Sequence, residues 1–328
     1  MPIWSEILNE LGKTRAQNGG VPNFDNVRRR YLSKLHHHSK RNIILYASGW
    51  LQKDQEPALI ASINDEDIQA FMEVTQGLEG SELDLILHSP GGSLEAAEAI
   101  VTYLRSRFSH IRVIVPQLAM SAATMIACSA DRIVLGKHSF LGPTDPQIYL
   151  STQLGIRQVA AQAILEQFDK AQKESADPTK LSAWLPMLSQ YGPDLLMRCE
   201  KAMELSKELV KTWLETYMLK EKRDGSDMAK QISDWLSNHE HFKSHSRHIS
   251  RDELQKQQLN ILKLEEDERL QDLSLSVFHA TTHTFTGTPA VKIVENHTGR
   301  AFIKQLIVQS TKGIQVDLTP KPQNNIKQ

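Results

Sequence analysis

Apolar runs alternate with amphipathic segments between residues 42 and 135, and this alternation predicts a sheet whose strands are joined by helices. Strands are expected at 42–48, 83–88, 111–116 and 132–135, and helices at 63–77, 93–107 and 121–129. Ser93 directly precedes a helically spaced apolar series, so we expect it to cap that helix. This order of elements favours an α/β unit with parallel strands and right-handed crossovers.

The segments on either side of this unit are mainly predicted to be helical. An apolar stripe through Trp4 and Leu11 predicts a helix that ends before the glycines of 18–22. After a rigid turn at 142–147, further helices are expected at 156–173, 192–219, 226–238 and 254–275, with a mixed segment at 278–304. We therefore expect a helical N-terminal extension (1–40), an α/β domain (41–262), a helical and mixed C-terminal extension (263–318) and a disordered tail (319–328).

Composition and charge narrow the class of protein. The formal net charge of −1 indicates no nucleic-acid partner. Cys128 and Cys199 are too few for a disulfide framework, and their apolar surroundings indicate buried free thiols in a reducing compartment. No apolar run reaches the roughly 18 residues that a membrane span needs, so no transmembrane segment is expected. The N-terminus has no basic segment before an apolar one, and a cytoplasmic location is therefore expected.

Motifs for a resident cofactor or metal are lacking. The glycine pair at 91–92, before the helix expected at 93–107, belongs to neither a Gly-x-x-x-x-Gly-Lys nor a Gly-x-Gly-x-x-Gly pattern, so no cofactor is expected. Three consecutive histidines at 36–38 point about 100° apart on a helix, which favours a solvated helix end over a metal site.

Two turns carry the candidate chemistry. Residues 88–93 (His-Ser-Pro-Gly-Gly-Ser) and 118–127 (Leu-Ala-Met-Ser-Ala-Ala-Thr-Met-Ile-Ala) each take an apolar strand into a helix through small residues. A serine at such a junction, beside free backbone N–H groups, is the arrangement that acyl transfer needs. Ser121 is therefore a candidate nucleophile, although serine is also common at helix starts for capping alone. The N–H groups of Gly91 or Gly92, together with that of Ala122, are candidates for an oxyanion hole.

The order of these motifs resembles that of Clp-type and signal-peptide-peptidase-type serine peptidases, which share the ClpP/crotonase fold. The chain is most similar to the serine dehydrogenase proteinase family, in residues 119–122, 142–147 and 243–250. The resemblance spans roughly residues 40 to 260 and implies a ClpP/crotonase-like α/β domain over 41–262. It further implies a serine endopeptidase that acts on peptide or protein substrates, needs no cofactor and forms a homo-oligomer.

Carried over to this sequence, the family's triad falls on Ser121 as nucleophile, Asp145 as orienting carboxylate and His245 as general base. Clp subunits use the order serine, histidine, aspartate, and their base position falls here on Asp145. The positions of the histidine base and the aspartate therefore look exchanged in this chain. A triad is defined by its geometry and not by the order of its residues, so such an exchange is allowed. Alternatives stay open at this point. Asp145 precedes Pro146 and could organise a turn. Rival bases to His245 are His248, His241, His239 and Lys137, the last as part of a Ser–Lys dyad.

Two other functions remain as alternatives. The first is a catalytically inactive scaffold of the same fold that binds peptides or membrane-associated partners, so peripheral contact with a membrane is left open. The second is a crotonase-type acyl-CoA enzyme, which also polarises a carbonyl with paired N–H groups. The sequence offers no basic cluster near Ser93 for the phosphates of CoA, so we rank it last.

Overall fold

The computed structural model describes residues 3–53, 58–152 and 155–306, and its centre is a seven-stranded sheet. The strand order is β10 (Ile261–Lys263), β5 (Arg132–Leu135), β3 (His110–Val115), β2 (Glu82–His88), β1 (Asn42–Ser48), β11 (Ala290–Asn296) and β12 (Ala301–Gln305). The first five strands are parallel, whereas β11 and β12 run antiparallel to their neighbours. The predicted α/β class is confirmed.

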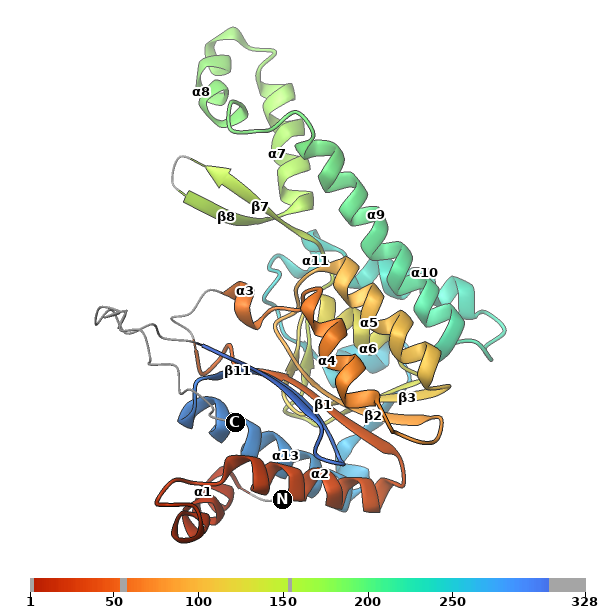
Figure 1. Ribbon diagram of the computed structural model, residues 1–328. Coiled ribbons are helices and arrows are strands. Elements are labelled where there is room, and N and C mark those ends of the chain that lie inside the picture. The colour runs from red at the N-terminus through yellow and green to blue at the C-terminus, as the bar shows by residue number, and fades with distance from the viewer. Residues whose placement is uncertain (1–2, 54–57, 153–154, 307–328) are drawn as a thin grey trace, which may run out of the picture.

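Helices cover both faces of this sheet, because successive side chains of a strand point to opposite sides. Ile44 and Tyr46 of β1 pack among residues of α4 (Glu66–Thr75), α5 (Leu94–Arg107) and α6 (Ala122–Cys128). Ile43 and Leu45 face α2 (Phe24–Ser39) and α13 (Glu268–Gly287) instead. Figure 1 shows α4, α5 and α6 on one side of the strands and α2 and α13 on the other.

A second, three-stranded sheet lies beyond the carboxyl end of β2. Its order is β4 (Leu118–Ala119), β6 (Phe140–Leu141) and β9 (Ile249–Ser250), with β4 parallel to β6 and β6 antiparallel to β9. A bridge between Ser89 and Ala119 joins the chain after β2 to β4. This small sheet therefore continues the edge at which the large parallel strands end.

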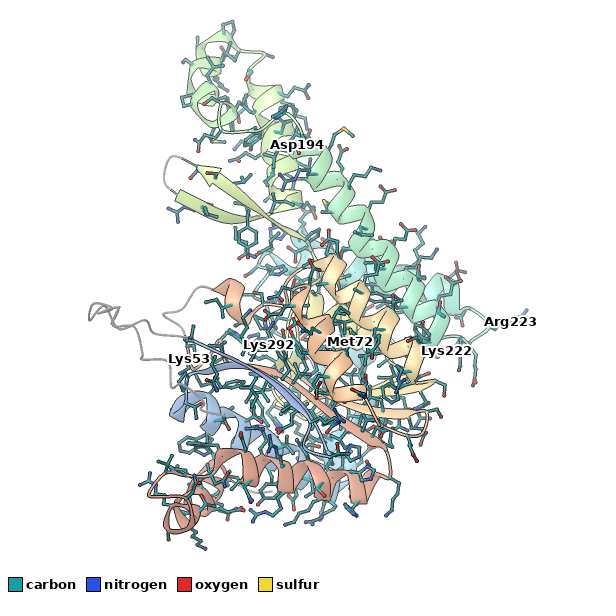
Figure 2. The ribbon with its side chains drawn as sticks, in the orientation of Figure 1. Lys53, Met72, Asp194, Lys222, Arg223 and Lys292 are labelled. Atoms are coloured by element: carbon teal, nitrogen blue, oxygen red, sulfur yellow. The ribbon has the colours of Figure 1, made fainter. Side chains whose placement is uncertain are left out.

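An arm projects from this body (Figure 1). It is formed by β7 (Gln147–Thr152), β8 (Gly155–Ala160), α7 (Ala161–Glu174), α8 (Pro178–Leu188) and the first part of α9 (Leu195–Trp213). Ile148, Ile164 and Leu195 pack in an apolar cluster separate from the main core. In Figure 2, Asp194 marks the start of α9, whose later residues pack on the main core, and Lys222 lies in the loop after the π-helical turn at Leu214–Met218 that follows α9.

The helix expected at 156–173 is wrong over its first residues. Ile156 to Ala160 belong to β8, which pairs antiparallel with β7. Gly155 has a φ of 97°, a left-handed conformation that suits the turn of a hairpin. A further helix, α8, is absent from the elements expected above; it starts at the N-cap Asp177 with Pro178 in its first turn.

The helix expected at 254–275 is wrong as well. The chain there forms α12 (Arg251–Lys256), then β10, a 3₁₀ turn at Leu264–Glu266 and α13, whose cap Asp267 accepts from the Leu270 N–H. β10 adds to the edge of the large sheet beside β5. Between α9 and α12 lie α10 (Gly225–Leu236) and the short α11 (His239–Phe242).

The terminal segments pack onto the same sheet as the rest of the chain. α1 (Trp4–Thr14), the 3₁₀ turn at Arg15–Gln17 and α2 lie beside α13, and β11 pairs with β1. The short α3 (Ala58–Ala61) precedes α4. The predicted boundaries at residues 40 and 262 stay predictions, and the tail predicted at 319–328 lies outside the described residues.

Cys128 and Cys199 are both buried free thiols. Burial raises the pKa of Cys128 to about 12, so this thiol stays protonated and unreactive at neutral pH. None of the helices over the described residues combines the length and apolar composition that crossing a bilayer requires.

A buried imidazole makes stability depend on pH. His88, at the end of β2, packs between Trp50 and Phe278, edge-on to the latter, and burial lowers its pKa from 6.5 to about 3. Between those values the unfolded chain binds a proton that the folded chain does not, so stability falls as pH falls. We expect His88 to contribute about 1.4 kcal/mol of lost unfolding free energy per pH unit in that window.

Urea denaturation at several pH values measures this slope. Burial also lowers the pKa values of His279 and His297 to about 4, so they act in the same direction. His88→Phe keeps a ring between Trp50 and Phe278 but takes up no proton. It should therefore remove the contribution of His88 to the change of unfolding free energy with pH. Equal slopes for this variant and the natural protein would contradict the assignment to His88.

Candidate active site

The strand directions of the small sheet bring the three predicted triad residues to one edge. β4 and β6 are parallel, so their carboxyl ends share an edge, and the amino end of antiparallel β9 lies there too. Ser121 follows β4, Asp145 follows β6 after a short turn, and His245 shortly precedes β9. The Ser89–Ala119 bridge brings the glycine turn at 91–92 to the same edge.

Ser121 occupies a strained junction between β4 and α6. Its φ of 54° and ψ of −122° are unusual for a residue with a side chain, and its hydroxyl does not cap α6. Thr124 fixes the turn instead, because its hydroxyl donates to Ala119 O and accepts from the Gly142 N–H. Strain at a serine whose side chain serves no structural hydrogen bond in the described chain is typical of a functional position.

The two glycines of the first turn differ in what their N–H groups do. The Gly91 N–H donates to the Ser89 hydroxyl at 3.2 Å. The Ile63 N–H donates to Gly91 O, and Ile63 O accepts from the Ser93 N–H. Gly92 lies between these two bonds, so its own N–H points away from Ile63. Gly92 is exposed, and over the described residues its N–H has no acceptor. This geometry favours Gly92 over Gly91 as an oxyanion donor.

The second candidate donor is the N–H of Ala122. Ala122 is the first residue of α6, so no carbonyl of the helix accepts from it. The positive end of the helix dipole also lies at this position. Ala122 is fully buried, unlike Gly92.

Asp145 is held by its neighbours in the chain and by two histidines. The Thr144 N–H donates to Leu236 O of α10, and Thr144 O accepts from the Ser206 hydroxyl of α9. The Asp145 side chain is 3% exposed, and its Oδ1 lies 2.8 Å from His245 Nδ1. Its Oδ2 lies 2.8 Å from Nδ1 of a second histidine, His239.

The structure thus joins Asp145 to His245, but over the described residues no hydrogen bond joins the Ser121 hydroxyl to either histidine. Catalytic hydrogen bonds are often long in structures without substrate, so this absence alone excludes neither histidine. His239 was weighed from the sequence only as one of several rivals; its contact with Asp145 depends on the placement of α11, for which the spacing of the histidines gives no signal.

The other rival bases lie apart from Asp145. His248 is exposed and stacks on Phe140, with ring centroids 5.3 Å apart. His241 packs against Trp235 and Phe242. Lys137 is exposed, and its backbone N–H donates to Glu265. A lysine must be buried away from water to act as a base, so the exposure of Lys137 disfavours a Ser–Lys dyad.

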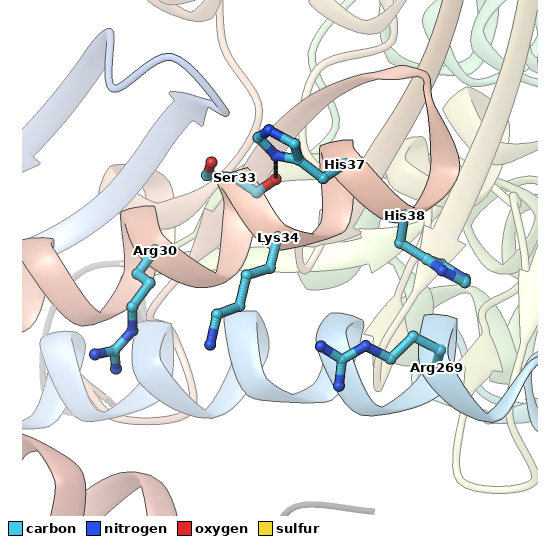
Figure 3. Close-up of a pocket in the computed structure, with 6 residues that line it drawn as sticks. All are labelled: Arg30, Ser33, Lys34, His37, His38 and Arg269. Carbon is cyan, nitrogen blue, oxygen red and sulfur yellow. Dashed lines mark hydrogen bonds between the residues drawn. The ribbon is translucent and has the colours of Figure 1, made fainter.

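Metal-ligating side chains do not gather into a site over the described residues. No group of three or more histidine, cysteine, aspartate or glutamate side chains there has a geometry suited to a metal ion. A groove of about 520 Å³ lies between α2 and α13, on the face of the large sheet opposite α6; Figure 3 shows its lining by Arg30, Ser33, Lys34, His37, His38 and Arg269. Arg30 pairs with Glu10 and His38 pairs with Asp267, so the positive charge of the groove's lining is partly neutralised.

Gly91 leaves room for Ser121, and we expect Gly91→Ala to displace that residue. A Cβ at position 91 would lie 2.6 Å from both Ser121 Cβ and Met120 O, and Gly91 has a φ of 97°. Labelling by a serine-directed probe should fall by at least about 100-fold, which is the cost of a 1 Å misplacement of reacting groups.

The matched control is Gly77→Ala. Gly77 has a φ of 79°, but a Cβ there would meet nothing within 4 Å. It therefore introduces similar backbone strain without the clash. Equal labelling by the two variants would show that the Gly91 contact does not position Ser121.

Comparisons with known proteins agree with this arrangement. Residues 61–263 match the model of a family described as ClpP-like SDH-type serine proteinases. Two proteins of Methanocaldococcus jannaschii, uncharacterized protein MJ1495 and uncharacterized protein MJ0137, are similar to part of the chain. The first is 33% identical over 150 residues (43% of this chain and 49% of that protein), and the second is 34% identical over 143 residues (41% and 48%).

The chain spans about half the length of these two curated relatives. The family match, in contrast, covers more than half of this chain and includes Ser121, Asp145 and His245. It confirms the resemblance inferred from the sequence motifs, and the ClpP-like fold agrees with the observed α/β architecture. The chain belongs to the family of ClpP-like SDH-type serine proteinases.

Proposed function

We propose that this chain is a serine endopeptidase that hydrolyses bonds in peptide or protein substrates. The observation that carries the proposal is the convergence of strand ends in the small sheet, which brings Ser121, the Asp145–His245 pair and the glycine turn to one edge. Membership of a family of serine proteinases supports the same reaction class.

In the proposed mechanism, the Ser121 oxygen attacks the carbonyl carbon of the peptide bond while His245 Nε2 takes the hydroxyl proton. Asp145 accepts from His245 Nδ1 at 2.8 Å, which fixes the tautomer and stabilises the imidazolium that forms. The N–H groups of Gly92 and Ala122 donate to the oxyanion. His245 then gives its proton to the leaving amine, and water releases the acyl group from Ser121 by the reverse sequence.

The proposal extends to assembly and location. The arm exposes the apolar side chains Ile156, Leu185 and Met197, which are 74%, 55% and 63% accessible. Exposed apolar side chains of this kind suit a contact between copies, so we propose a homo-oligomer. Two free thiols support a reducing compartment such as the cytoplasm.

A fluorophosphonate probe tests the reaction class. We expect mass spectrometry to find the adduct on Ser121, and labelling to be slowed by Asp145→Asn and by His245→Ala. Ser93→Ala is the matched control, because Ser93 caps α5 in the neighbouring turn and has no proposed catalytic role. An adduct on another serine, or equal labelling of all variants, would refute the proposed triad.

A non-catalytic scaffold is the second candidate. Two observations favour it: the Ser121 hydroxyl has no hydrogen bond to His245 over the described residues, and Ala122 is fully buried. A folded, oligomeric protein that never labels, with or without added peptide, would support the scaffold and overturn the peptidase.

A further inference from the structure

Asp145 has a second partner that the proposed triad does not use. Its carboxylate is almost fully buried, and each oxygen has one imidazole at 2.8 Å: Oδ1 contacts His245 Nδ1 and Oδ2 contacts His239 Nδ1. A buried carboxylate oxygen without a donor is costly, and over the described residues no other group donates to Oδ2.

We propose that His239 is a positioning residue, which holds the Asp145 carboxylate so that Oδ1 faces His245. This inference rests on the proposed function and assigns His239 no contact with substrate. By donating to Oδ2, His239 fixes the rotation of the carboxylate about its Cβ–Cγ bond. Without that donor, the carboxylate can turn Oδ2 toward other partners, and His245 loses a fixed acceptor.

The backbone around His239 supports a fixed role. His239 opens α11, whose N-cap Asn238 accepts from the His241 N–H at 2.9 Å, and the Lys243 N–H bonds to His239 O. Phe242, in the same turn, is buried in the main core. The imidazole therefore projects from an anchored turn and needs little ordering when it binds Asp145.

His245 is the better base of the two because of its place in the small sheet. It lies just before β9, whose amino end shares an edge with the end of β4 and thus with Ser121. His239 belongs to a helix that precedes this segment and has no strand pairing at that edge. His239 thus orients the carboxylate through Oδ2, whereas His245, which is bound to Oδ1, transfers the proton.

The same substitution at both positions separates the two roles. Asparagine places an amide N–H near the position of histidine Nδ1, so it can still donate to Asp145 but has no Nε2 to accept a proton. We expect His239→Asn to label with fluorophosphonate and to cleave peptide close to the natural rate. His245→Asn should lower kcat by about 10⁶-fold, as when a triad histidine is removed.

His239→Ala removes the donor and should lower kcat by roughly 10- to 100-fold, the range found for outer hydrogen-bond partners of metal ligands. KM should stay unchanged, because His239 does not contact the substrate. A general structural defect would not be rescued by the asparagine. If His239→Ala is fully active, the inference is wrong; if His239→Asn is inactive while His245→Asn is active, His239 is the base instead.

A spectroscopic readout keeps this inference separate from the proposed function. In ¹⁵N-histidine-labelled natural protein, the Nδ1–H signals of His239 and His245 should both be hydrogen-bonded and protected from exchange. His239→Ala should lose or broaden the His245 signal, whereas His239→Asn should retain it. A protein that never labels but shows this pattern refutes the peptidase and keeps the positioning role; an unchanged His245 signal in His239→Ala overturns the inference.

Discussion

Ser121→Ala is expected to lower peptide hydrolysis by about 10⁴- to 10⁶-fold, the loss seen when the nucleophile of a catalytic triad is removed. The fold should tolerate this change, because the Ser121 hydroxyl neither caps α6 nor bonds to any other described group. The free energy of unfolding of Ser121→Ala should therefore stay close to that of the natural protein.

Ser121→Gly should be just as inactive but more stable. The φ of 54° and ψ of −122° suit glycine far better than serine, and relief of such strain stabilises a fold by about 1 kcal/mol. Chemical denaturation of the three proteins measures this. A glycine variant less stable than the natural protein would show that the serine side chain contributes packing that outweighs the strain.

Asp67→Asn is expected to lower the free energy of unfolding by about 3–5 kcal/mol, since it leaves a buried charge unpaired. Lys292 Nζ lies 2.7 Å from Asp67 Oδ1, and both side chains are 1% exposed. Nζ also donates to Ser62 O, and the Tyr46 hydroxyl donates to Asp67 Oδ2. Figure 2 labels Lys292, which belongs to β11, and its pair with Asp67 connects β11 to α4.

Burial lowers the pKa of Lys292, and the charge of Asp67 opposes that change. Loss of the carboxylate charge therefore favours loss of the lysine proton as well. The double variant Asp67→Asn with Lys292→Met removes both charges and should recover part of the stability.

A surface pair provides the control for Asp67→Asn. Glu73 and Arg300 lie 3.2 Å apart with side chains 47% and 45% exposed, and Glu73→Gln should cost less than about 1 kcal/mol. Equal denaturation midpoints for Asp67→Asn and Glu73→Gln would contradict the importance of burial.

Long periodic segments with clear boundaries could be predicted from the sequence. The strand expected at 42–48 is β1 with the same bounds, and Ser93 caps α5 by accepting from the Ala96 N–H, as its position indicated. Local pattern and tertiary packing agree at these places, so the apolar spacing suffices.

Elements that depend on distant partners could not be predicted. β10 is three residues long and exists as a strand because β5 pairs with it, and β4, β6 and β9 are two residues each, shorter than any detectable period. These short strands bring the candidate site together. Family motifs pointed to Ser121, Asp145 and His245, whereas the contact of His239 with Asp145 required the structure.

The pairing of β6 with β9 has a consequence for the timing of synthesis. His245 lies 100 residues after Asp145. At translation rates of about 5–20 residues per second, a growing chain carries the serine and the aspartate for about 5–20 s before the histidine is made. Through that interval the proposed nucleophile, Ser121, has no imidazole from the segment before β9 of its own chain. A nascent peptidase of this design would be unable to cut neighbouring unfolded chains until most of its own sequence has left the ribosome.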